Sequence, residues 1–201
     1  MKERPILFNG EMVRAILDGR KTQTRRIITR WKIRGMDNGY PEGVVVVNES
    51  THNLETVPWT AETIMHYLRC PYGVPGDRLW VRETWMPETE QGIPTGGIIW
   101  RASDNKPMPD GDGPLRWKPS IHMPKSASRI TLEVTGMQVE QVQDISEEDA
   151  YAEGIDLAPT IPHPLVWFRD LWDSINVKRG FGWDVNPWVW VVTFNQYKDI
   201  S

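Results

Sequence analysis

The chain has 201 residues, of which 39% are hydrophobic, and its formal net charge is -4 at pH 7. This net charge argues against a globally basic nucleic-acid-binding protein. No apolar run reaches the length of a membrane-spanning helix, and the first residues lack the apolar core of a signal peptide. The single cysteine, Cys70, cannot form an internal disulfide. We therefore expect one domain over residues 1–201, located in the cytoplasm and not attached to a membrane.

Charge is distributed unevenly along the sequence. Residues 1–34 contain ten lysines and arginines against three acids, whereas residues 140–156 contain seven acids and no base. Either these two segments face each other across one site, or they form two separate solvated surfaces. The sequence leaves both interpretations open.

The first elements are well signalled. Asn9 is a good N-cap, and apolar residues follow it at helical spacing until Gly19, so we expect a short helix over about 10–18. A strand is expected next, over residues 24–29.

Two segments rich in glycine and proline interrupt the regular pattern. We interpret residues 31–75 and 87–120 as loop-rich insertions. Strands with alternating polarity are expected at 78–83 and at 128–134.

The C-terminal part contains two expected helices and one strand. A short acidic helix is capped by Ser146 and ends at Gly154, and a longer helix begins at His163 with proline in its first turn. Residues 187–194 are apolar at both parities, which predicts a strand buried on both faces in the middle of a sheet. The order of elements predicts an α+β protein, namely a small, mainly antiparallel β-barrel with peripheral helices.

Metal and nucleotide-triphosphate chemistry are not indicated. The four histidines are far apart in the sequence, and neither an H-x-x-x-H nor a C-x-x-C spacing occurs. Glycine-rich phosphate-binding loops are also absent from the sequence. We therefore expect no metal and no cofactor.

Aromatic and basic residues outside the regular elements are candidates for contacts to a nucleic acid. The chain has eleven tryptophans, and Trp85 lies at the end of an expected strand, where it is suited to stack on a base or to pack beneath a loop. Arg129 ends a polar segment that begins at His122, which is suited to contact phosphates or to form a solvated loop.

The segment Gly19–Arg26 is the most informative part of the chain. It packs four cations and two threonine hydroxyls into eight residues directly after the expected helix. Such a density of charge is costly to bury and repels itself when exposed, so an anionic partner or a reaction site explains it better than solubility does.

This segment resembles the ASCH (activating signal cointegrator homology) family, whose β-barrel is similar to the PUA RNA-binding fold. The pattern G-x-K-x-x-x-x-R carries the resemblance between a capped helix and a strand, and the turn at Gly76-Asp77 and the acidic helix at 146–154 support it. The segments 4–8 and 78–85 resemble the phage and prophage branch, which implies the cytoplasm of a bacterial host cell.

Small bacterial members of this family are N4-acetylcytidine amidohydrolases that use a lysine, a threonine and a glutamate. The G-R-K-T-x-T frame carries the first two over to Lys21 and Thr24, and the end of the acidic helix indicates Glu153. The resemblance therefore implies catalysis by these three residues without a metal.

The neighbouring arginines are candidates for holding the substrate. We assign this role to Arg20, Arg25 and Arg26, of which Arg26 is suited to hold an oxyanion or a substrate oxygen.

The proposed chemistry is physically coherent but sets a condition on the backbone. A threonine hydroxyl needs an adjacent base, and a lysine serves if desolvation or nearby arginines lower its pKa. Positions 21 and 24 of a regular strand face opposite sides, so a turn or bulge must separate Lys21 from Thr24. The alternatives are that Lys21 only pairs with acids, that Thr24 is an ordinary strand residue and that Glu153 is exposed to water.

Three functions remain open at this point. The first is an amidohydrolase acting on an N4-acylated cytidine or a related modified nucleoside, and the second is a non-catalytic module that binds RNA, DNA or a modified base. The third is a ribonuclease, because that activity is also implied by the resemblance. The partner is accordingly a modified nucleoside or a nucleic acid, and the oligomeric state is not predicted.

Overall fold

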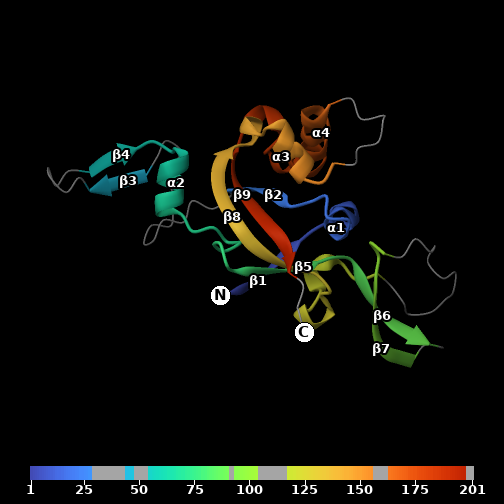
Figure 1. Cartoon of the computed structure of the whole chain (residues 1–201). Coiled ribbons are helices and arrows are strands. Elements are labelled where there is room, and N and C mark those ends of the chain that lie inside the picture. Colours follow the sequence, from blue (N-terminus) through green and yellow to red (C-terminus); the bar gives the residue numbers. More distant parts are fainter. Residues whose placement is uncertain (29–43, 48–53, 91–92, 104–116, 156–162, 198–201) are drawn as a thin grey trace.

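The structure is a computed structural model, shown in Figure 1, in which the elements of the chain can be followed from one end to the other. It describes residues 1–28, 44–47, 54–90, 93–103, 117–155 and 163–197. Outside these described ranges lie residues 29–43, 48–53, 91–92, 104–116, 156–162 and 198–201, which include parts of both predicted insertions.

The described residues form four α-helices and nine strands, together with short 3-10 turns. In chain order they are β1 (Glu3–Leu7), α1 (Gly10–Leu17), β2 (Gln23–Ile27), β3 (Val44–Val47), β4 (Leu54–Val57), α2 (Ala61–Tyr67), β5 (Arg78–Arg82), β6 (Trp85–Glu90), β7 (Ile93–Trp100), β8 (Thr131–Gln141), α3 (Glu147–Ala152), α4 (Pro164–Asn176) and β9 (Trp188–Tyr197). None of the helices in this described part is long and apolar enough to cross a membrane.

Five strands form the central sheet in the order β1-β5-β8-β9-β2. The pair β1–β5 is parallel and the other pairs are antiparallel, with an irregularity between Val134 and Gly136 where β8 meets β9. The hairpins β3–β4 and β6–β7 extend from this body on opposite sides (Figure 1). The expected α+β class with a mainly antiparallel sheet is therefore confirmed.

A closed barrel, in contrast, is not found among the described residues. Strands β1 and β2 are the two edges of the sheet, and no backbone ladder joins them. The edges are connected by a side chain instead, because Nη2 of Arg26 donates to the carbonyl oxygen of Leu7 at 2.6 Å.

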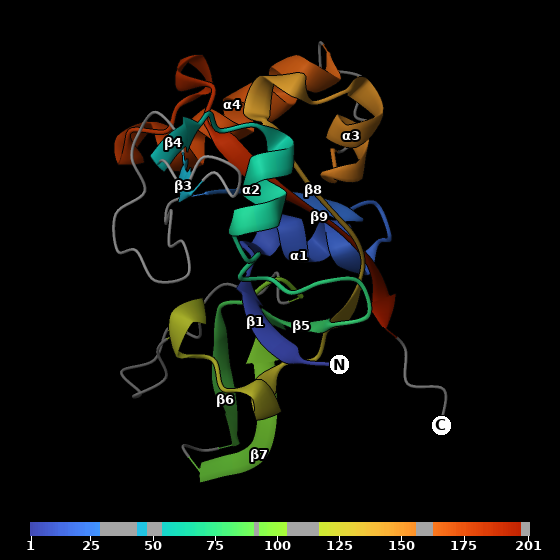
Figure 2. The same cartoon turned by 90° about the vertical axis from the view of Figure 1, so that its left-hand side faces the viewer.

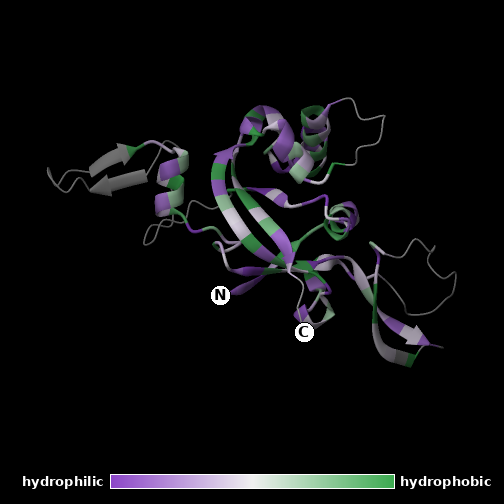
Figure 3. Cartoon of the chain, viewed as in Figure 1, coloured by the Kyte–Doolittle hydropathy of each residue, from purple (hydrophilic) through white to green (hydrophobic). Residues whose placement is uncertain are grey.

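Strand β9 lies between β8 and β2, as its apolar residues at both parities predict. Its side chains enter two separate hydrophobic cores. Trp190 and Val192 join the core formed with α1, α2 and the inner face of the sheet, whereas Val189 and Val191 join a second core with α3 and α4. Figure 3 shows the resulting mixture of hydrophobic and hydrophilic bands along β8 and β9. Burial on both faces explains why β9 carries no polar face over these residues.

The helices are positioned by their caps. The side chain of Asn9 accepts a hydrogen bond from the Met12 backbone at 2.8 Å and starts α1, whose Val13 and Ile16 are buried. The hydroxyl of Ser146 caps α3 by accepting from the Asp149 backbone at 3.1 Å. Figures 1 and 2 show α3 and α4 together at one end of the sheet, with α1 nearby. This arrangement brings the exit of α1, the start of β2 and the end of α3 to one place.

Candidate functional site

The exit of α1 determines where Lys21 lies. Gly19 has a left-handed backbone conformation with φ of 74°, and the backbone nitrogens of Arg20 and Lys21 both donate to the carbonyl of Ala15, at 2.9 and 3.0 Å. Lys21 consequently precedes β2, which begins at Gln23. The turn at Gly19 comes before Lys21, which forms an isolated bridge with Glu153, and the turn or bulge expected between Lys21 and Thr24 is not found in this described stretch.

Lys21 and Glu153 form a buried ion pair. The Nζ atom of Lys21 lies 2.6 Å from Oε2 of Glu153 and also donates to the Glu153 carbonyl at 2.8 Å. Only 2% of Lys21 and 4% of Glu153 are exposed. Burial lowers the pKa of Lys21 below its ordinary value, although the Glu153 charge acts in the opposite direction.

Gly154 allows the two backbones to approach. Its φ is 98°, and a Cβ atom at this position would lie 2.9 Å from Cβ of Ala15 and 2.9 Å from Cβ of Lys21. Lys21 and Glu153 form an isolated antiparallel bridge at this point, and Thr22 donates to the Ala152 carbonyl at 2.9 Å. A glycine is therefore required after Glu153 for both conformational and steric reasons.

Arg25 links the basic segment to the acidic one. Its guanidinium is buried and bonds to Gln23 Oε1 at 2.6 Å, Glu140 Oε1 at 2.7 Å, Asp149 Oδ2 at 2.8 Å and Glu153 Oε1 at 3.4 Å. Burial raises the pKa of Glu140, although Arg25 acts in the opposite direction. Of the two interpretations that the sequence left open, the structure supports the one in which the charged segments face each other.

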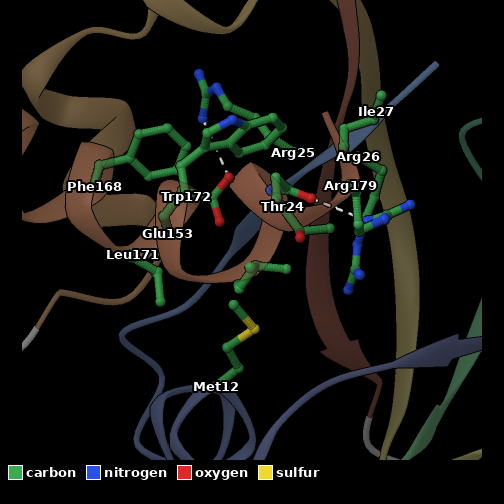
Figure 4. A pocket seen from close by; sticks show the side chains of 12 residues that line it. Met12, Thr24, Arg25, Arg26, Ile27, Glu153, Phe168, Leu171, Trp172 and Arg179 are labelled. Carbon is green, nitrogen blue, oxygen red and sulfur yellow. Dashed lines mark hydrogen bonds and ion pairs between the residues drawn. The ribbon is translucent and has the colours of Figure 1, made fainter. Parts of the chain in front are cut away.

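A solvent-open pocket lies beside this network, between β2 and α4 (Figure 4). One wall is polar and the other is aromatic and aliphatic. The polar wall contains Thr24, Arg26 and Glu153, and the apolar wall contains Phe168, Leu171 and Trp172. Such a combination of apolar surface with a few converging polar groups is typical of small-molecule sites.

Thr24 and Glu153 both face this pocket, whereas Lys21 lies behind Glu153. Thr24 is 2% exposed, and its hydroxyl makes no hydrogen bond with the part of the chain that the structure describes. Lys21 does not line the pocket, and its Nζ lies 5.7 Å from the centre of the Phe8 ring. The carboxylate of Glu153 is thus the group that connects the buried amine to the pocket.

Arg26 occupies the same wall. Its guanidinium lies 5.0 Å from the centre of the Phe8 ring, and its Nε atom is buried without a hydrogen-bond partner. Burial lowers the pKa of this guanidinium.

Three of the candidate substrate-binding residues do not line this pocket. Arg20 bonds to Asp18 at 2.8 Å and to the Gly154 carbonyl at 2.8 Å, so it supports the Glu153 segment from outside. Trp85 is buried in β6, and Arg129 bonds to both carboxylate oxygens of Glu83 at 2.9 and 3.0 Å. Trp85 and Arg129 lie in the region of the β6–β7 hairpin, away from the pocket that Thr24 and Glu153 line.

The sequence did not indicate the contribution of α4 to the site. Phe168, Trp172 and Asn176 repeat at intervals of four and line one side of the pocket. In the sequence, the polar residue Asn176 at the same helical spacing as Phe168 and Trp172 is the signal that this face of the helix contributes to a site. In the structure, Asn176 is 4% exposed. Over the described ranges, no cluster of three His, Cys, Asp or Glu side chains suitable for a metal ion is found.

Fold and site together define a small α+β protein with a buried lysine–glutamate pair beside a pocket. No protein-family model and no curated protein matches this chain. Among solved structures, it is similar to an ASCH domain from Lactobacillus crispatus, with a TM-score of 0.41 and 13% identity over 97% of this chain and 79% of that one. It is also similar to a protein of the DUF984 family from Enterococcus faecalis, with a TM-score of 0.43 and 10% identity over 100% of this chain and 85% of that one.

Proposed function

We propose that the protein is a metal-independent amidohydrolase that removes the acyl group from an N4-acylated cytidine or a related modified nucleoside. The observation that carries this proposal is the buried ion pair of Lys21 with Glu153, 2.6 Å apart, behind a pocket that Thr24 and Glu153 line. The proposal includes membership of the ASCH family, in its phage and prophage branch with a PUA-like fold, on the motif residues at 19–26 and 146–154.

The pocket suits a flat heterocycle with one polar edge. Phe168 and Trp172 supply an aromatic wall, and the indole nitrogen of Trp172 is already bonded to the Phe181 carbonyl at 2.8 Å. That wall therefore offers contact surface and no unsatisfied donor from Trp172. The opposite wall offers the Thr24 hydroxyl and the Glu153 carboxylate to the acylated amine.

In the first step, the Thr24 oxygen attacks the acyl carbon, and a bond forms between them. The hydroxyl proton passes to Glu153, and Glu153 passes a proton to the neutral amine of Lys21 behind it. The bond between N4 and the acyl carbon then breaks, and the same relay returns the proton to N4. Cytidine leaves with its amine restored, and the acyl group remains on Thr24 as an ester.

In the second step, water attacks the ester. Its proton enters the Glu153–Lys21 relay, the bond to Thr24 breaks, and the threonine hydroxyl is restored as the carboxylic acid leaves. Atoms balance as one water consumed for one amide bond broken. Arg26, on the same wall, is suited to hold an oxygen of the substrate.

The protonation state of Lys21 decides whether this relay works. A protonated lysine in water is no base at neutral pH, so the mechanism needs a lowered pKa. Burial of Lys21 acts in this direction. The Glu153 carboxylate beside it is also shared with Arg25, whose Nη1 lies 3.4 Å from Glu153 Oε1, so its attraction to the lysine charge is weaker.

The test is release of cytidine from N4-acetylcytidine, followed by chromatography. We expect turnover by the wild type, a loss of at least about a hundredfold in Thr24→Ala and partial activity in Thr24→Ser, which keeps the hydroxyl. Thr22→Ala is the matched control, because it removes a neighbouring threonine hydroxyl that does not line the pocket. No turnover of any N4-acylated cytidine by the wild type, or unchanged turnover in Thr24→Ala, contradicts the proposal.

A second candidate, non-catalytic binding of RNA or DNA, is favoured by a separate observation near the β6–β7 hairpin. Three cations there lie over indole rings. Because Trp85 is buried and Arg129 is paired with Glu83, the pair of Arg101 with Trp117 is the one suited to stack on a base and contact a phosphate. The pairs are Lys118 with Trp85 at 4.9 Å, Arg101 with Trp117 at 5.8 Å and Arg129 with Trp100 at 4.8 Å.

This candidate predicts binding of single-stranded RNA or DNA that weakens as salt concentration rises. Fluorescence anisotropy with short labelled oligomers measures it, and Arg101→Gln is expected to weaken binding. Absence of binding, or an affinity that salt does not change, contradicts the candidate.

A further inference from the structure

The cations around the pocket differ in whether a carboxylate neutralises them. Lys21 pairs with Glu153, Arg20 pairs with Asp18, and Arg25 pairs with three acids. Arg26 differs, because no carboxylate of the described residues forms an ion pair with it and its hydrogen-bond acceptor is the Leu7 carbonyl. Its guanidinium is therefore not bonded to any carboxylate in the part of the chain that the structure describes, although the Glu153 charge on the same wall attracts it.

A second arginine without a carboxylate partner lines the same pocket. Arg179 follows α4 and is exposed, and its Nη1 atom donates to Oδ1 of Asn176 at 3.0 Å. Asn176 is 4% exposed and belongs to the buried side of α4, so it holds Arg179 from inside the protein. Within the described ranges Arg179 makes no ion pair. Figure 4 shows the guanidinium groups of Arg26 and Arg179 at the same end of the pocket.

Two cations in this position repel each other unless an anion joins them. Arginine does not release its proton in proteins, so neither charge disappears. Burial lowers the pKa of Arg26, the nearby Tyr72 and Glu153 act in the opposite direction, and the Arg179 charge, on the same pocket, acts with burial. The buried Nε of Arg26 also lacks a hydrogen-bond partner. At this end of the pocket, two arginines are not bonded to any described carboxylate, and the buried Nε of Arg26 lacks an acceptor.

We propose that Arg26 and Arg179 bind the phosphate group of a nucleotide whose base lies against Phe168 and Trp172. The substrate is then an N4-acylated cytidine that carries a phosphate, either as a mononucleotide or as a residue of a nucleic-acid chain. This inference rests on the proposed function for the base, and on the Arg26–Arg179 pair alone for the phosphate.

A phosphate group matches the hydrogen-bond donors of Arg26 and Arg179. The planar guanidinium group presents paired N–H donors that match the oxygens of a phosphate, and two guanidiniums match the charge of a phosphate monoester near neutral pH. The Asn176 contact fixes Arg179 before the ligand arrives, which reduces the entropy lost on binding. The carboxylate Glu153 also lines the pocket, but both of its oxygens already face Lys21 and Arg25.

The experiment is isothermal titration calorimetry with two reaction products, cytidine and cytidine 5'-monophosphate, at low salt. We expect the wild type to bind the monophosphate about tenfold more tightly than cytidine, or better, and this ratio to fall toward one in Arg179→Gln. Lys178→Gln is the matched control, because it removes one positive charge from the adjacent residue, which does not line the pocket. Equal binding of the two ligands by the wild type, or an equal loss of the ratio in Lys178→Gln, overturns the proposal.

A third ligand identifies the source of the phosphate. A short single-stranded RNA that binds more tightly than the monophosphate, with the same dependence on Arg179, assigns the phosphate to a nucleic-acid chain. An RNA that binds no better than the monophosphate assigns it to the mononucleotide. Binding of inorganic phosphate alone with equal affinity to the monophosphate overturns the nucleotide and leaves only an adventitious anion site.

Failure of this inference is distinguishable from failure of the proposed function. If the monophosphate binds as expected and no N4-acylated cytidine or cytidine nucleotide is hydrolysed, the proposed reaction is wrong and the phosphate site stands. If N4-acetylcytidine is hydrolysed and the monophosphate gains no affinity over cytidine, the phosphate site is wrong and the reaction stands.

Discussion

The ammonium nitrogen of Lys21 lies 2.6 Å from a carboxylate oxygen of Glu153 although 132 residues separate them in the sequence. Neither side chain reaches bulk water to a useful extent, since their side chains are 0% and 3% exposed. A buried pair of this kind contributes little net stability compared with apolar residues of the same shape, because desolvation offsets the attraction. Its presence beside a pocket therefore indicates a function better than it explains stability.

Removal of one partner of this pair is expected to destabilise the fold. Lys21→Met leaves the Glu153 carboxylate with only the longer contact to Arg25. We expect the free energy of unfolding to fall by about 3 to 5 kcal/mol, measured by urea denaturation. The double variant Lys21→Met, Glu153→Leu is expected to recover a large part of this loss, because no buried charge remains unpaired. A double variant no more stable than Lys21→Met contradicts the prediction.

The contact that Gly154 permits leads to a second prediction. Gly154→Ala combines a strained positive φ with a Cβ atom 2.9 Å from both Ala15 and Lys21, so we expect a loss of about 2 to 4 kcal/mol and reduced activity. Gly180→Ala is the control, because Gly180 also has a positive φ, of 80°, but open space around it. There we expect a loss of about 1 kcal/mol. Equal losses at the two positions, in thermal or urea unfolding, contradict the steric argument.

The charge network around Arg25 leads to a third prediction. Arg25→Leu leaves three carboxylates, those of Glu140, Asp149 and Glu153, without their shared cation. We expect a loss of about 3 to 5 kcal/mol in the free energy of unfolding at neutral pH, and a smaller loss at acidic pH where these groups accept protons. Arg169→Leu is the control, because Arg169 pairs with Asp170 on the surface and is expected to contribute less than about 1 kcal/mol. An equal loss in the two variants contradicts the prediction.

The direction of the Lys21 pKa shift predicts how stability depends on pH. Because burial lowers this pKa below its ordinary value of 10.5, the unfolded chain binds more protons than the folded one between the two values. Stability from this group is therefore fully present above 10.5 and is lost as pH falls through the lower folded value. The measurement is the urea midpoint of the wild type against pH, with Lys21→Met as the comparison. The same slope in both proteins contradicts the assignment to Lys21.

The sequence predicts those elements of the fold whose bounds depend on neighbouring residues alone. The cap at Asn9 and the glycine at position 19 delimit α1, and the doubly apolar segment Trp188–Phe194 lies in the middle of the sheet as β9. The sequence does not predict whether the sheet closes into a barrel or stays open. Whether the sheet closes depends on which strands pair at its edges. The parallel pairing of β1 with β5 joins segments far apart in the sequence, and the alternation of polar and apolar side chains does not predict such a pairing.

The site was predictable on its β2 side and not on its α4 side. Lys21, Thr24 and Glu153 lie in a dense motif and at a helix end; in the structure Lys21 pairs with Glu153, and Thr24 and Glu153 line the pocket. Arg179 carries no local signal, because its role depends on where α4 ends relative to β2. Trp85 and Arg129 are residue types suited to contact a ligand. In the structure, however, Trp85 is buried and Arg129 forms an ion pair with Glu83.

The acyl-enzyme is the species that the proposed reaction cannot avoid. Intact-protein mass spectrometry after rapid mixing with N4-acetylcytidine and acid quenching, followed by peptide mapping, detects it. We predict a protein heavier by one acetyl group, with the group on Thr24, and no such species in Thr24→Ala. Hydrolysis of the substrate by Thr24→Ala at the wild-type rate, or an acetyl group that forms on another residue in step with turnover, contradicts the mechanism.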